Sequence, residues 1–126
     1  MKYIFCATAL LLTLAICCCA VVWRISELTT VISTQLQNAE EALRRGDFEL
    51  TEAYVSDAHR CWLRHQGFCG TVIRHAETDT LSESLTLALF HAKLQNRIEL
   101  QSLLVTLQSR LQHLSDMEQA HYYNFL

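Results

Sequence analysis

A run of 21 residues without a charged side chain, residues 3–23, constrains this chain more than any other feature. As an α-helix rising 1.5 Å per residue, the run is about 30 Å long, which matches the hydrocarbon core of a bilayer. Trp23 and Arg24 then form a typical interface boundary, an aromatic ring at headgroup level followed by a charge. The sequence predicts a membrane anchor at residues 1–24, with lipid contact through residues 3–23, and a helical domain at residues 25–126.

Two other kinds of leader fit these residues less well. A secretory signal peptide has a shorter apolar stretch and a small-x-small cleavage site, of which Cys18-Cys19-Ala20 is only a weak version. A lipoprotein signal places a small residue directly before the modified cysteine, whereas Ile16 precedes Cys17. We therefore interpret the leader as a single-pass signal anchor in the cell membrane. The positive charges on the two sides, Lys2 and the free amine against Arg24, Arg44 and Arg45, leave the orientation open. Because the N-terminal tail is very short, we expect the domain to be extracytoplasmic.

The part of the chain after Trp23 has a helical composition. Proline is absent from the chain and glycine occurs three times, while Leu, Ala, Glu, Gln and Arg dominate this part. About 100 residues are enough for one modest core. All 13 acidic residues of the chain lie here and outnumber the basic ones, and a mildly acidic domain is a poor nucleic-acid binder. We expect no nucleic-acid partner.

Apolar residues recur every three to four positions along this domain, as they do in amphipathic helices. The first helix continues out of the anchor and ends at Arg44-Arg45-Gly46-Asp47, which supplies cations, a glycine and a cap for the next helix. The second helix starts near Phe48, and Gly67 and Gly70 allow a kink or a short break in it. The predicted inward positions are Leu28, Ile32, Leu36, Ala39 and Leu43, then Val55, Ala58, Cys61, Trp62, His65, Cys69, Val72, Ile73 and Ala76.

Two capping boxes predict where the last two helices begin. In Thr80-Leu81-Ser82-Glu83 and in Asn96-Arg97-Ile98-Glu99, the first and last side chains can satisfy each other's backbone amides. The predicted inward positions are Leu81, Leu85, Ala88, Leu89 and Ala92, then Leu100, Leu103, Leu104, Leu107, Leu111 and Leu114. Residues 43–50 and 94–100 share one turn pattern, which indicates two stacked hairpins. Short links make neighbouring helices antiparallel. The predicted fold is all-α, an N-terminal transmembrane helix followed by a small up-down bundle of about four helices.

The six cysteines fall into two groups. Four lie in the leader, where they are interpreted as small apolar residues in lipid. Cys61 and Cys69 lie eight positions apart, about 12 Å along a continuous helix, which is beyond the reach of a disulfide. A bridge between them needs a break at Gly67 or Gly70, so we expect two unbridged buried thiols while leaving the pairing open.

The order of these features resembles a family of small bacterial membrane-anchored helical proteins, domain of unknown function 4363. The residues that carry the resemblance are Trp62, the His-x-Glu-x-Asp segment at residues 75–79, and Asn124-Phe125 near the end. Phe68 stands where members of the family usually have a second tryptophan or a similar ring. The resemblance covers nearly the full length and implies helical topology and membrane anchoring. It implies no enzymatic activity and no cofactor.

His75, Glu77 and Asp79 form the most suggestive polar cluster. His75 and Asp79, four positions apart, share one helix face and could offer two ligands to a divalent metal. A firm site needs more ligands, which one of the scattered histidines His59, His65 and His113 would have to supply. The simpler interpretation places the acidic residues at a helix start, where negative charge suits the helix dipole. No motif predicts a catalytic residue.

Trp62 is interpreted as a core residue, and the leucine stripe of the last helix as core first and as a surface for a partner helix second. Cys69 and His65, four positions apart, could meet, although a buried thiol is usually inert. The apolar tail at residues 122–126 is expected to pack on the domain or to touch lipid or a partner.

Three functions follow as hypotheses. The leading one is a non-enzymatic protein-interaction module at the cell membrane with an unidentified protein partner. The alternative is a metal- or ligand-sensing domain built around His75, Glu77 and Asp79, and a polar pocket lined by all three would favour it. The third and weakest is a redox role for Cys61 and Cys69.

Overall fold

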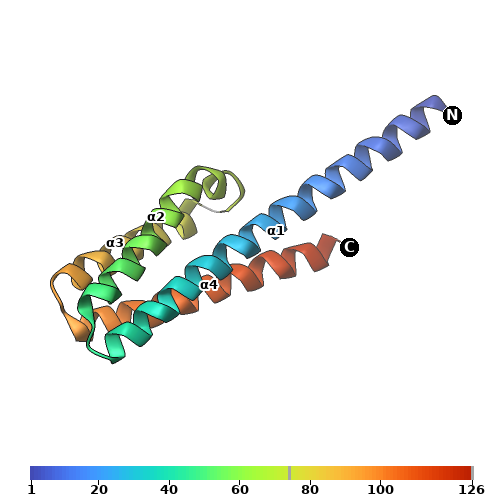
Figure 1. The fold of residues 1–126 in the computed structure, drawn as a ribbon. Helices are drawn as coiled ribbons and strands as arrows, with labels where there is room; N and C mark the ends of the chain where they lie inside the picture. Colours follow the sequence, from blue (N-terminus) through green and yellow to red (C-terminus); the bar gives the residue numbers. More distant parts are fainter. Residues whose placement is uncertain (74, 126) are drawn as a thin grey trace.

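The computed structural model of the protein describes residues 1–73 and 75–125, apart from the side chains of Val72, Glu118, His121, Tyr122, Asn124 and Phe125. These residues form four α-helices: α1 (Lys2–Arg44), α2 (Phe48–Val72), α3 (His75–Lys93) and α4 (Arg97–Phe125). Each helix packs on the next, and α4 also packs on α1, so the helices form an up-down bundle (Figure 1). The predicted all-α fold is confirmed.

α1 has two environments along its length. Its N-terminal half extends beyond the other helices (Figure 1). This half contains an apolar stretch of 18 residues that is long enough to cross a membrane and is not buried by the rest of the protein. The first fully buried side chain is Ile25, although Val21 already packs partly against the core. The helix runs without interruption across the expected boundary after residue 24. One continuous helix therefore forms both the apolar segment and the first helix of the bundle.

The core consists of the predicted apolar stripes. All five inward positions of α1 are buried, as are Val55, Ala58, Trp62, Cys69 and Ile73. The leucine stripe of α4 is also buried, with Leu103 only partly covered, so it is not a free surface for a partner helix. One predicted inward position is wrong, because Ala76 belongs to α3 and is exposed. Val72 was also predicted to face inward, and its side chain lies outside the described residues.

The α1–α2 turn is a glycine-dependent helix end. The Asp47 N–H donates to the Ala42 carbonyl and the Gly46 N–H donates to the Leu43 carbonyl, both at 3.0 Å, with Gly46 at a φ of 79°. This pair of bonds is a Schellman motif, which needs a left-handed residue. The Asp47 carboxylate then accepts from the Leu50 N–H at 3.0 Å and caps α2, as predicted.

The α3–α4 turn repeats this geometry 49 residues later. The Asn96 N–H donates to the His91 carbonyl at 3.0 Å and the Gln95 N–H to the Ala92 carbonyl at 3.1 Å. The Asn96 side chain caps α4 by accepting from the Glu99 N–H at 3.4 Å. The two turns are joined, because Arg97 donates from a guanidinium nitrogen to the Arg44 carbonyl at 3.3 Å. The turn pattern shared by residues 43–50 and 94–100 thus corresponds to two helical hairpins whose turns have the same geometry and lie side by side.

The predicted capping box at Thr80 is wrong. α3 begins at His75, five residues earlier, and the Thr80 hydroxyl donates to the Ala76 carbonyl at 2.6 Å from inside the helix. α2 continues through Gly67 and Gly70 to Val72, and the chain becomes extended at Ile73, with ψ at 152°. The acidic Glu77 then lies in the first turn of α3, where its negative charge interacts favourably with the positive end of the helix dipole.

The register between α1 and α4 is fixed by a reciprocal pair of hydrogen bonds. The Ser33 hydroxyl donates to Gln108 Oε1 at 2.8 Å, and Gln108 Nε2 donates to the Ser33 carbonyl at 3.1 Å. Because both partners are partly buried, a sliding of either helix would leave polar groups without partners. This pair places position 108 of α4 level with position 33 of α1.

Gln95 occupies the left-handed position at a φ of 55°, where its counterpart is Gly46. A side chain in this region costs about 1–2 kcal/mol, whereas the extra backbone entropy of glycine costs about 0.5–1 kcal/mol. We expect Gln95→Gly to raise the free energy of unfolding by about 0.5–1 kcal/mol, measured by guanidinium denaturation of the detergent-solubilised protein. The matched variant Gly46→Ala should lower it. A loss of stability in Gln95→Gly would contradict the shared design of the two turns.

Candidate functional site

The three candidate ligands do not form one site. His75 and Asp79 are exposed on α3, whereas Glu77 is half-buried on another face and lines a pocket of about 230 Å³ near the α2–α3 turn. The other lining residues are Trp62, Ile73, Ala76, Thr78, Thr80, Leu81, Arg110 and Leu114. The pocket therefore contains only one of the three residues that would have marked a sensing site.

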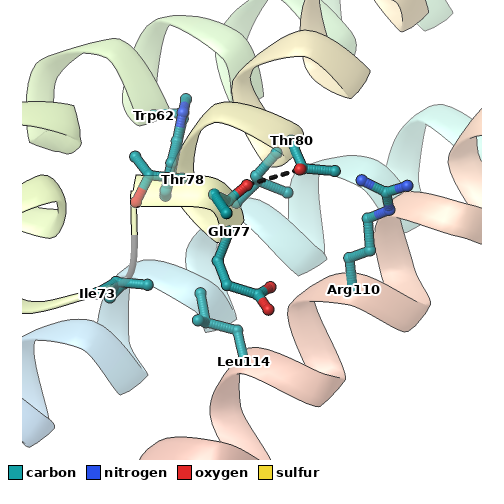
Figure 2. Close-up of a pocket in the computed structure, with 9 residues that line it drawn as sticks. Trp62, Ile73, Glu77, Thr78, Thr80, Arg110 and Leu114 are labelled. Atoms are coloured by element: carbon teal, nitrogen blue, oxygen red, sulfur yellow. Dashed lines mark hydrogen bonds between the residues drawn. The ribbon is translucent and has the colours of Figure 1, made fainter.

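The charged groups of this pocket come from two helices. Figure 2 shows the Glu77 carboxylate directed toward Leu114 of α4, while the Arg110 side chain rises from α4 with its guanidinium turned away from that carboxylate. Residues of opposite charge thus line one pocket, which the Trp62 ring also lines. Arg110 and Leu114 could not be assigned to this place from the sequence, because they are more than 30 positions from Glu77 and carry no local motif.

Of the three histidines proposed as additional ligands, His59 and His65 have hydrogen-bond partners elsewhere, and His113 is exposed on α4. His65 Nδ1 lies 2.9 Å from the Cys61 carbonyl of its own helix, and His59 Nε2 lies 3.3 Å from the Thr86 hydroxyl on α3. Partial burial lowers the pKa of His59, so its neutral form is favoured at neutral pH. Among the residues that the structure describes, no three His, Cys, Asp or Glu side chains gather where they could hold a metal ion.

Trp62 is the largest buried side chain of the bundle and is only 1% exposed. Its indole Nε1–H donates to the Ser82 hydroxyl of α3 at 2.6 Å. The ring therefore fills the core while its one polar atom is satisfied across the helix interface. This arrangement confirms the interpretation of Trp62 as core and gives Ser82 a structural role that the sequence did not indicate.

The two thiols of the domain lie along one uninterrupted helix and are not joined by a disulfide. Cys69 is buried and Cys61 is half-buried. Burial raises the pKa of the Cys61 thiol, against a smaller opposing effect of the Arg64 charge, so the reactive thiolate is disfavoured at neutral pH. These surroundings are typical of structural cysteines and give the redox hypothesis no support.

The surface carries one group of exposed apolar side chains that the sequence analysis missed. Leu87, Phe90 and Leu94 are spaced to lie along one side of α3 and its final turn, and Ile98 follows in the first turn of α4. We call these four residues the α3 patch. Their exposed fractions run from 42% for Leu87 to 80% for Ile98. Apolar spacing alone did not reveal the patch, since the same residue types on the opposite side of α3 form the core.

Removing the acceptor of the Trp62 hydrogen bond should destabilise the bundle. We expect Ser82→Ala to cost about 1–3 kcal/mol, because the buried indole N–H would lose its partner. Chemical denaturation in detergent, followed by circular dichroism, measures the change. The exposed Ser102 on α4 gives the matched control, and Ser102→Ala should change stability by less than about 0.5 kcal/mol. Equal losses in both variants would refute this role of Ser82.

The metal-sensing hypothesis has a direct test in thermal unfolding. Since a ligand that binds only the folded state raises the melting temperature, we expect zinc, manganese and calcium ions to leave that temperature unchanged in the full-length protein. An increase that disappears in both His75→Ala and Asp79→Ala would instead establish a site at these residues.

Comparison with known proteins gives a family and no further relative. No curated protein and no solved structure matches the chain. The family model described as "Domain of unknown function (DUF4363)" matches residues 20–125, which include the whole bundle and the end of the apolar segment. The match begins just before Val21, the position at which α1 first packs against the core. The chain is therefore a member of the DUF4363 family of domains of unknown function.

Proposed function

We propose that this protein is a non-enzymatic interaction module, tethered to the cell membrane by residues 3–23, whose helical bundle binds another protein. The tether is supported by the apolar half of α1, which extends from the bundle with its side chains uncovered. The binding role is supported chiefly by the α3 patch. Large apolar groups collected on one surface of a small domain are a feature of protein-interaction sites.

The position of the α3 patch suits a partner that approaches from the aqueous side. The patch surrounds the C-terminal end of α3 and the start of α4, at the end of the bundle that lies farthest from the N-terminus of α1 (Figure 1). An anchored bundle would therefore present these side chains away from the lipid. Phe90, which is 55% exposed, gives the patch an aromatic side chain of the kind enriched at protein–protein interfaces.

The dispersal of the ionisable groups supports a role without catalysis. His75 and Asp79 face solvent, and only Glu77 enters the pocket. The thiol of Cys61 is shifted toward its protonated form. An acid–base or nucleophilic site needs such groups within hydrogen-bond reach of one reacting atom. The arrangement of these groups fits a binding surface better than it fits a catalytic site.

We place the bundle on the extracytoplasmic side of the membrane as part of this proposal. Lys2 precedes the apolar segment and Arg24 follows it, so positive charge flanks both ends of the segment, and the protease step described below tests the side. The family resemblance suggests a bacterial cell membrane as the setting.

Site-specific photo-crosslinking tests the binding surface and the side together. With benzoylphenylalanine in place of Phe90, we expect irradiated cells to give one discrete protein adduct, which Leu94→Asp abolishes because it places a charge in the apolar contact. Protease added outside intact cells should remove the adduct if the bundle is extracytoplasmic.

Val105 of α4 supplies the matched control, since it is equally exposed at 56% but lies outside the α3 patch. The probe at this position should give no discrete adduct. The same adducts from both positions, or none from Phe90, would remove the α3 patch as the binding surface.

A further inference from the structure

The register of α1 and α4 determines how far α4 reaches toward the membrane. Trp23, the expected interface residue, lies ten positions before Ser33 in the sequence, or about 15 Å along α1 toward its N-terminus. Because the helices are antiparallel, position 118 of α4 is level with Trp23. α4 continues as a helix to Phe125, and its last turns therefore extend about 10 Å beyond that level.

The packing of α1 supports this alignment from the other side. Val21 lies within the expected lipid-contacting segment, yet it is half-buried and packs against the bundle core. The bundle therefore reaches the level of residue 21, inside the apolar segment. Figure 1 shows the C-terminal end of α4 running toward the N-terminal half of α1.

The end of α4 is helical, and where its side chains are described they are exposed. Leu114 is the last buried side chain described in α4, and the described side chains from Asp116 to Tyr123 are exposed. The final five residues of the sequence are Tyr-Tyr-Asn-Phe-Leu, an apolar and aromatic composition. Tyrosine and tryptophan are concentrated at the level of lipid headgroups, where one end of the ring is apolar and the other wet. A helix end with this composition, at which the described Tyr123 is 77% exposed, is suited to a lipid interface.

We propose that the last turns of α4 lie at the membrane interface beside the anchor, from headgroup level near position 118 into the outer part of the apolar layer, so that the protein contacts lipid through two helices. The inference rests on the proposed membrane tether. Two contacts, one spanning and one interfacial, prevent the bundle from swinging about a single helix. They hold the α3 patch at a set height and orientation above the membrane.

Photo-crosslinking to lipid tests this placement in the full-length protein reconstituted into vesicles of phosphatidylcholine and phosphatidylglycerol. Benzoylphenylalanine replaces one residue at a time: Tyr123 at the end of α4, Phe5 within the anchor, and Val105 on the exposed side of α4 away from the membrane. All three native side chains are more than half exposed, so the probe should not disturb the core. Intact-mass measurement after irradiation detects the added lipid.

We expect lipid adducts from the probes at Phe5 and Tyr123 and none from the probe at Val105. Adducts at Phe5 alone would overturn the interfacial placement while keeping the tether. Cross-links from position 123 only to α1 of the same chain would also overturn it, since the end of α4 would then pack on protein. No adduct at Phe5 would overturn the tether itself.

Discussion

The apolar stripe of α1 that begins at Ile25 is the contact on which the rest of the structure depends. α1 packs against both α2 and α4, and its stripe positions Ile32, Leu36 and Ala39 are completely buried between them. Because the same helix continues into the apolar segment, each contact that holds the bundle together also sets its direction relative to that segment. A flexible link between anchor and domain would have separated the two. Because α1 is continuous, its orientation determines where the other helices and the α3 patch lie.

The two helical hairpins are matched in their turns and joined at one end. Gly46 and Gln95 both take the left-handed conformation, and Asp47 and Asn96 both cap the following helix. The Arg97 side chain links the turns by donating to the last turn of α1. About halfway along the bundle, the Ser33 and Gln108 side chains hold α1 and α4 in register. These polar contacts at different heights keep the apolar stripes aligned, since apolar packing alone has little directionality.

The polar residues that suggested a metal site point to different sides of α3, because residues two positions apart on a helix do not share a face. His75 and Asp79 share an exposed side of α3, and Glu77, two positions from each, points to a different side and enters the pocket beside Arg110. Leu87, Phe90 and Leu94 of the α3 patch are instead spaced to lie along one side of α3 and its final turn. The contrast between dispersed ionisable groups and aligned apolar ones is the physical basis of the proposed binding role.

The sequence by itself determined the helices, the apolar segment and nearly all of the core, because these depend on local periodicity, glycine and caps at the right positions. It predicted the buried stripes of α1 and α4 and the turn at Gly46 correctly. It placed the cap of α3 at Thr80, which lies inside the helix, because a threonine inside a helix can bond to the carbonyl four residues back as readily as it can cap. The short links already predicted that consecutive helices pack together, and the tertiary structure alone decided which sides of the helices meet. It thereby brought Arg110 to the pocket of Glu77, gave the Trp62 indole its acceptor on Ser82, and set the end of α4 against the level of Trp23. Those contacts join residues far apart in the chain, and no local pattern encodes which side of one helix meets another.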